Sequence, residues 1–214
     1  MEENRLYPRM FTWLFVGLMI TFISGYCLSL NETLLYNVLS IGIIPIIVIE
    51  LLIAVFMGIR VKKMSPFTTK LCYIVYSITT GITFSTIFLT YKMSSIMFIF
   101  LVTAILFGIF ALIGYFTKID LTRFSTLLFI ALIGIILVSI LNIFIFKSSQ
   151  LELTLSIICI IVFLGYIAYD IQSTKYLMVS IGEEKAAVYG AFQLYLDFIN
   201  VFIKLLQLFG KNDN

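Results

Sequence analysis

The chain has 214 residues, of which 62% are hydrophobic and only 12% are charged, and its mean hydropathy is +1.13. A soluble domain carries roughly twice that share of charged residues, so the composition excludes an ordinary water-soluble fold and predicts an all-α integral membrane protein. The net charge of +3 is small and the basic residues lie at the ends of apolar runs, which argues against a nucleic-acid-binding surface.

Seven apolar runs follow one another along the chain, each near the ~20 residues that a helix needs to cross a bilayer. We predict membrane-spanning helices at residues 10–30, 38–60, 67–91, 95–116, 122–146, from about 153 onward, and 186–208. Pro45 lies inside the second run and predicts a kink in that helix. Because the connections are short, we expect a single seven-helix transmembrane domain over residues 1–214.

Lysine and arginine are unevenly divided between the two sides of these spans. If the N-terminus is inside, the cytoplasmic segments hold ten: Arg5, Arg9, Arg60, Lys62, Lys63, Lys70, Lys118, Arg123, Lys175 and Lys185. The outer segments hold four: Lys92, Lys147, Lys204 and Lys211. The positive-inside rule therefore predicts a cytoplasmic N-terminus, and seven spans then place the C-terminus outside.

The last run combines an apolar helix with one polar face. At steps of three and four residues it carries Ala186, Gly190, Gln193, Asp197, Asn200 and Lys204. Residues at this spacing share one face of an α-helix, and lipid cannot satisfy polar groups, so the face is predicted to lie toward a protein interior or a water-filled cavity. An ionisable group such as Asp197 costs roughly 2.5–3.5 kcal/mol to place in a membrane helix, which the rest of the chain must offset.

Three acidic residues lie within apolar runs: Glu50, Asp170 and Asp197. If the sixth and seventh spans form a hairpin, Asp170 and Asp197 are each about 13 residues from its centre and lie at matching depth. Two carboxyl groups in contact share a proton and titrate in two steps, and carboxylates are oxygen ligands that suit calcium. We therefore predict that this pair is a pH sensor, part of a cation pathway and a calcium site. Unrelated structural roles remain the alternative.

Five further residues are candidates for the same site or for contacts between helices. Arg60, at the cytoplasmic end of the second span, is the natural countercharge or latch for the aspartates, although its alternative role is snorkelling to lipid headgroups. Glu50 lies deeper and either donates a structural hydrogen bond or lines a pathway. Asn142 and Asn200 are expected to form interhelical hydrogen bonds, and Gln193 shares the polar face of the last span.

Three stretches of the chain carry a resemblance. Leu194-Tyr195-Leu196-Asp197-Phe198-Ile199-Asn200 closely resembles the last-helix signature of the Bax inhibitor family, also called the transmembrane Bax-inhibitor-motif family. Tyr169-Asp170-Ile171-Gln172 resembles its sixth-helix motif, and Thr80-Gly81-Ile82-Thr83-Phe84-Ser85 resembles its third-helix motif. The resemblance implies seven helices with the last one central and surrounded by the other six. It also implies a pH-sensitive calcium leak with Asp170 and Asp197 as the sensor, and an arginine that maps onto Arg60.

Three functions are consistent with these features. The first is a calcium leak channel gated by the aspartate pair, the second a proton-coupled calcium or cation exchanger, and the third a membrane regulatory protein that acts through protein partners. The chain has no histidine, and no metal cluster or nucleophile–base pair is apparent, so we expect neither an enzyme nor a resident cofactor. The expected partners are the lipid bilayer, calcium ions and protons. Short loops and a short tail look prokaryotic, which predicts a bacterial plasma membrane.

Overall fold

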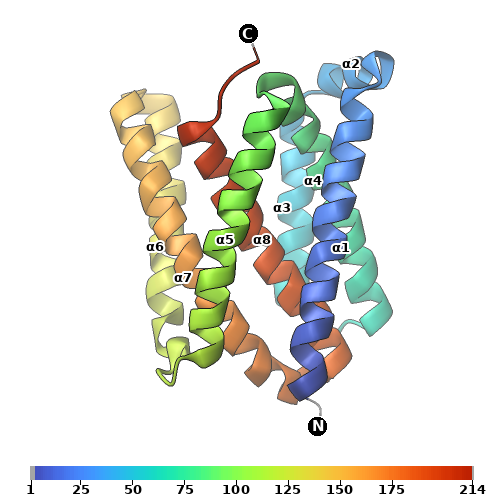
Figure 1. Cartoon of the computed structure of the whole chain (residues 1–214), viewed down its shortest axis with the longest axis vertical. Coiled ribbons are helices and arrows are strands. Elements are labelled where there is room, and N and C mark those ends of the chain that lie inside the picture. Colours follow the sequence, from blue (N-terminus) through green and yellow to red (C-terminus); the bar gives the residue numbers. More distant parts are fainter. Residues whose placement is uncertain (1–2, 214) are drawn as a thin grey trace. The chain divides into compact units, whose positions relative to one another are not determined.

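The structure, a computed structural model, describes residues 3–213 and within that range consists of helices without a strand. The elements, shown in Figure 1, are α1 (Glu3–Ser29), α2 (Glu32–Ile41), α3 (Ile43–Arg60), α4 (Pro66–Thr90), α5 (Met93–Phe116), η1 (Leu121–Phe124), α6 (Ser125–Leu141), η2 (Asn142–Phe146), α7 (Ser149–Ile181) and α8 (Glu183–Phe209). Seven helical segments of the described chain are long and apolar enough to cross a membrane. The predicted all-α membrane fold with seven spans is thereby confirmed.

The start of the second span differs from the prediction. Residues 38–41 belong to the short helix α2, and the chain breaks at Gly42, whose φ of 87° lies in the left-handed region that glycine adopts freely. Pro45 is the third residue of α3, within the first turn, where a proline removes no intrahelical hydrogen bond. The predicted kink at Pro45 is therefore wrong, because the bend lies three residues earlier, at a glycine.

Helices α7 and α8 are joined by a single residue. Helix α7 continues to Ile181, Gly182 takes a φ of 84°, and α8 begins at Glu183. Side chains with a Cβ are disfavoured at that φ, so glycine is what permits so short a connection. Asp170 lies 12 residues before Gly182 and Asp197 lies 15 residues after it, so the turn falls close to the centre assumed for the predicted hairpin.

The chain forms two compact units, which we describe separately. Unit 1 comprises residues 1–93, 174–195 and 212–214. Here α1 and α4 approach closely at glycines: a Cβ added to Gly25 would lie 2.6 Å from the carbonyl oxygen of Gly81. Small residues let helix backbones pack at such distances. Edge-to-face contacts with ring centroids 5.1–5.9 Å apart join α4 to α8 through Tyr73, Tyr76, Phe192 and Tyr195.

Unit 2 comprises residues 94–173 and 196–211. Helices α5 and α7 meet at Gly114, where an added Cβ would lie 2.3 Å from the carbonyl oxygen of Ala168. Helix α8 contacts α5 through Phe198, whose ring centroid is 5.2 Å from that of Phe100 and 5.7 Å from that of Phe107. Close backbone packing and phenyl rings thus join the helices of this unit.

Helix α8 is the least hydrophobic of the seven spans and the most deeply buried. In its most apolar stretch the mean hydropathy is 1.4 and 72% of the residues are buried, whereas the other spans have values of 1.5–3.0 and 6–39%. A helix with a polar face must be shielded from lipid, which explains why hydropathy and burial run in opposite directions here. The central position of α8 among the other six helices and the single-domain organisation stay predictions.

Candidate functional site

The candidate site contains Asp170 on α7 and Asp197 on α8, both in unit 2. The two residues are only 3% and 4% exposed, and a side-chain hydrogen bond joins their carboxyl groups. An ionised carboxylate can only accept hydrogen bonds, so a bond between two carboxyl groups requires a proton on one of them. The structure thus places two buried carboxyl groups within hydrogen-bonding reach of each other on α7 and α8, and a shared proton stays a prediction.

One carboxyl oxygen of the pair can still accept a hydrogen bond or bind an ion. Oδ2 of Asp197 is buried and has no hydrogen-bond partner among the described residues. Buried polar atoms are nearly always paired, and the exceptions occur at strained sites, at catalytic sites or at sites that take up water or an ion. An unpaired carboxyl oxygen fits a proton or a hard cation such as Ca²⁺, because both are attracted to carboxylate oxygens.

The number of available ligands limits how tightly a cation is held. Stable calcium sites supply six to eight oxygen ligands. In the described part of the chain no group of three or more acidic, histidine or cysteine side chains is placed to hold a metal ion. Among the described acidic side chains, this pair thus offers a cation two carboxyl groups.

The residues that follow the two aspartates in sequence make a local hydrogen bond on α7 and aromatic contacts with α5. The hydroxyl of Ser173 donates to the backbone carbonyl of Asp170 over 3.4 Å, one turn further along α7. Phe198, the residue after Asp197, packs against Phe100 and Phe107 of α5. The carboxyl group of Asp170 also has a side-chain hydrogen bond with Ser173, so Asp197 is not its only partner.

Arg60 and Glu50 both belong to unit 1. Arg60 is the last residue of α3 and its side chain is exposed, so its role as a latch for the aspartates stays a prediction. Glu50 is half-buried, and its Oε1 accepts a hydrogen bond of 2.8 Å from the hydroxyl of Thr83 on α4. Glu50 thus accepts a hydrogen bond from a neighbouring helix, and its two considered roles, a protonated hydrogen-bond donor or part of a pathway, stay predictions.

The predicted polar contacts of Asn142 and Asn200 turn out to be local. Asn142 is buried and exchanges two hydrogen bonds with the backbone of Ser148, of 3.0 and 3.2 Å, which close the connection between α6 and α7. Asn200 donates to the carbonyl of Leu196, one turn earlier on α8, over 2.7 Å. These bonds are not the interhelical bonds expected, because a short amide side chain reaches nearby backbone more readily than a second helix. Gln193 is half-buried on α8, and its proposed role stays a prediction.

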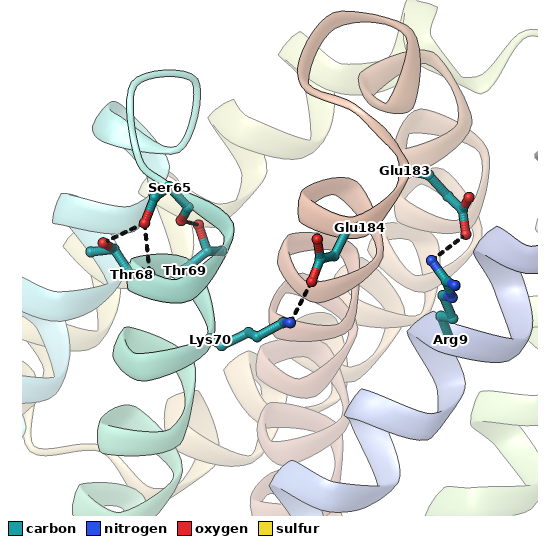
Figure 2. Close-up of polar contacts among 7 residues, drawn as sticks. All are labelled: Arg9, Ser65, Thr68, Thr69, Lys70, Glu183 and Glu184. Atoms are coloured by element: carbon teal, nitrogen blue, oxygen red, sulfur yellow. Dashed lines mark hydrogen bonds and ion pairs between the residues drawn. The ribbon is translucent and has the colours of Figure 1, made fainter.

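The first turn of α8 was not predicted to be a structural site. Glu183 forms an ion pair of 2.9 Å with Arg9 of α1, and Glu184 forms one with Lys70 of α4, as Figure 2 shows. Lys185 is only 8% exposed, and its ammonium donates to the backbone carbonyls of Lys62 and Met64. Three consecutive side chains thus attach α8 to three different segments of unit 1. The available sequence signal was a lysine directly before the tightly packed Ala186-Ala187-Val188.

A second unpredicted feature is a chain of hydroxyl groups inside unit 1. The hydroxyl groups of Tyr195 on α8 and Thr21 on α1 are 2.5 Å apart, and Thr21 is 2.9 Å from the backbone carbonyl of Ser77 on α4. If Thr21 donates its proton to that carbonyl, Tyr195 donates to Thr21. The chain of hydrogen bonds joins three helices without a formal charge.

The fold and the buried carboxyl groups define a class: an α-helical membrane protein with ionisable groups inside its spans. Residues 3–214 match the family described as Bax1-I, inhibitor of apoptosis-promoting Bax1. The chain is 38% identical over 217 residues to the inner membrane protein YbhL of Escherichia coli strain K12, covering 95% of this chain and 90% of that protein. The protein therefore belongs to the Bax inhibitor family, as the motifs predicted.

Other relatives span most of the chain as well. An uncharacterized protein of Borreliella burgdorferi is 32% identical, with 99% of this chain and 94% of that protein covered. An uncharacterized membrane protein of Streptococcus pyogenes serotype M1 is 34% identical, with 78% and 73% covered. These names and the seven apolar helices place the protein in a lipid bilayer. The plasma membrane and the orientation of the termini stay predictions.

Proposed function

We propose that the protein is a calcium leak channel whose conducting state depends on pH through the protonation of Asp170 and Asp197. The observation that carries the proposal is the hydrogen-bonded pair of buried carboxyl groups on consecutive spans. Membership of the Bax inhibitor family supports it, because the motifs around both aspartates resemble those of the family's pH sensor.

The shared proton couples pH to the packing of α7 and α8 within unit 2. When one carboxyl is protonated, a hydrogen bond joins the two helices at this point. When the proton leaves, two negative charges face each other in an apolar setting, and their repulsion favours separation or the entry of a cation. Protons and calcium ions therefore compete for the same oxygen atoms, and each changes the equilibrium between two arrangements of the helices.

The proposal is tested with the full-length protein in liposomes that contain a calcium-sensitive dye. Calcium entry is measured between roughly pH 5 and pH 8, the range in which a proton-controlled leak has to respond to be physiologically useful. We compare wild type with Asp197→Asn, and with Asp120→Asn as a control, because Asp120 lies in the connection between α5 and η1, outside the spans. We expect a pH-dependent leak in wild type and in the control, and its loss in Asp197→Asn.

Two outcomes would contradict the proposal. If Asp197→Asn keeps both the flux and its pH dependence, the carboxyl pair is not the sensor. If wild type moves calcium uphill when a proton gradient is imposed, the same carboxyl groups serve an exchanger and not a passive leak.

A further inference from the structure

The turn between α3 and α4 contains both buried apolar side chains and exposed basic side chains. Val61 and Met64 are buried, whereas Arg60, Lys62 and Lys63 are exposed. We call residues 60–63 the basic turn. Three cationic side chains thus point away from the protein within four residues, directly at the end of a membrane-spanning helix.

Hydrogen bonds from Lys185 fix the backbone of the basic turn. The lysine ammonium donates to the carbonyl oxygen of Met64 over 2.9 Å and to that of Lys62 over 3.3 Å. The hydroxyl of Ser65 then caps the start of α4 by accepting from the backbone N–H of Thr68, as Figure 2 shows. The exposed cations therefore extend from a fixed backbone, which reduces the entropy that a ligand must remove on binding.

The positive charge of the basic turn is not neutralised by the nearby acids of α8. Glu183 and Glu184 are engaged by Arg9 and Lys70, as Figure 2 shows. Among the side chains that the structure describes, the ion pairs do not involve Arg60, Lys62 or Lys63. The described side chains of the protein thus leave these three charges without an ion pair.

Apolar side chains border these cations on both sides. Ile59 precedes the basic turn and Phe67 follows it near the start of α4, and both are among the most exposed large hydrophobic residues of the chain. Apolar side chains next to exposed lysine and arginine match the chemistry of a membrane boundary, where acyl chains meet charged headgroups.

We propose that the basic turn binds the phosphate-bearing headgroups of anionic phospholipids. Each lysine near an anionic membrane surface strengthens binding roughly fivefold, so Lys62 and Lys63 together contribute roughly 25-fold. The site lies apart from the aspartate pair in the sequence, belongs to the other unit, and does not depend on the protein conducting calcium.

The test measures lipid binding to the purified full-length protein in neutral detergent by native mass spectrometry, with phosphatidylglycerol and phosphatidylcholine as probes. The variant is Lys62→Gln with Lys63→Gln, which leaves Arg60 and the backbone carbonyls in place. The control is Lys92→Gln with Lys211→Gln, which also removes two exposed lysines. We expect roughly 25-fold weaker phosphatidylglycerol binding in the variant and a change within about twofold in the control.

Three results would overturn the proposal. They are equal loss in both double variants, equal binding of the zwitterionic and anionic lipids by wild type, and displacement of phosphatidylglycerol by inorganic phosphate. The last result would indicate a site for free anions. Unchanged melting temperatures of the variants exclude misfolding as the cause of a loss, and no outcome depends on calcium flux.

Discussion

Units 1 and 2 bury polar groups in different ways. In unit 1 a chain of neutral hydroxyl groups, from Tyr195 through Thr21 to the carbonyl of Ser77, joins three helices. In unit 2 the buried polar groups include two carboxyls that bond to each other and leave one oxygen unpaired. Hydroxyl groups need no change of charge to be satisfied, whereas a carboxyl pair depends on a proton or a cation. The hydroxyl chain of unit 1 therefore needs no proton or ion from outside, whereas a role of the unit 2 carboxyls in pH sensing stays a proposal.

The forces that join the helices differ as well. Both units pack helices through close backbone contacts at glycines and through aromatic rings, and unit 1 adds a buried lysine and two ion pairs at the start of α8. We therefore expect substitutions that remove a polar partner to lower the stability of unit 1. Substitutions that add volume at a close backbone contact should lower the stability of unit 2.

The largest effect is expected for Gly114→Ala in unit 2. The new Cβ would lie 2.3 Å from the carbonyl oxygen and 2.8 Å from the Cα of Ala168, and because backbone atoms cannot move aside alone, α5 and α7 must separate. We expect a loss of up to about 3 kcal/mol in the free energy of unfolding. Gly108→Ala on the same helix is the control, because its Cβ would meet no atom within 4 Å. Thermal unfolding in detergent compares the two, and equal melting temperatures would contradict the close contact.

The next effect is expected for Lys185→Met in unit 1. Methionine has a similar volume but cannot donate, so the carbonyls of Lys62 and Met64 lose their charged partner. We expect a loss of about 2 kcal/mol, whereas Lys63→Met, at an exposed position, changes stability by less than about 0.5 kcal/mol. If both variants unfold at the wild-type temperature, Lys185 does not hold the turn.

A smaller effect is expected for Tyr195→Phe. The substitution removes the hydroxyl that bonds to Thr21, while Thr21 keeps the carbonyl of Ser77 as its acceptor, so the loss should be about 1 kcal/mol. Tyr36→Phe removes a hydroxyl from a side chain that is 74% exposed and serves as the control. A melting temperature of Tyr195→Phe at or above that of the control would show that the hydroxyl chain does not stabilise unit 1.

The smallest effect concerns Asp120, a carboxyl outside the membrane spans. Hydrogen bonds from the hydroxyl and the backbone N–H of Thr122 hold the pKa of Asp120 below its ordinary value. A lowered pKa contributes stability above the unfolded-state pKa of about 3.9, and this contribution is lost as the pH falls through the folded-state pKa. Asp120→Ala should therefore melt slightly below wild type at neutral pH and at the wild-type temperature once the pH lies below the folded-state pKa of Asp120. A difference that persists in acid would show that the carboxylate charge is not responsible.

Much of the architecture could be predicted because lipid allows few alternatives. Apolar runs of sufficient length predicted the seven spans, and the hairpin assumed between Asp170 and Asp197 agrees with the turn at Gly182. The break at Gly42 was missed because proline is the commoner cause of a bend, although Pro45 lies where a helix tolerates it. The polar contacts of unit 1 could not be predicted, since Tyr195 and Thr21 are 174 residues apart. The sequence also does not distinguish a buried lysine such as Lys185 from a solvent-exposed lysine.

The central claim is that Asp170 and Asp197 act as one proton-controlled unit. The most direct test is the pH profile of calcium flux for wild type, Asp170→Asn, Asp197→Asn and the double variant in the same liposomes. We expect each single variant to lose the pH dependence, and the double variant to lose no more than either single, because residues that share a proton are strongly coupled. Additive losses in the double variant, or a single variant that keeps the wild-type profile, would contradict the claim.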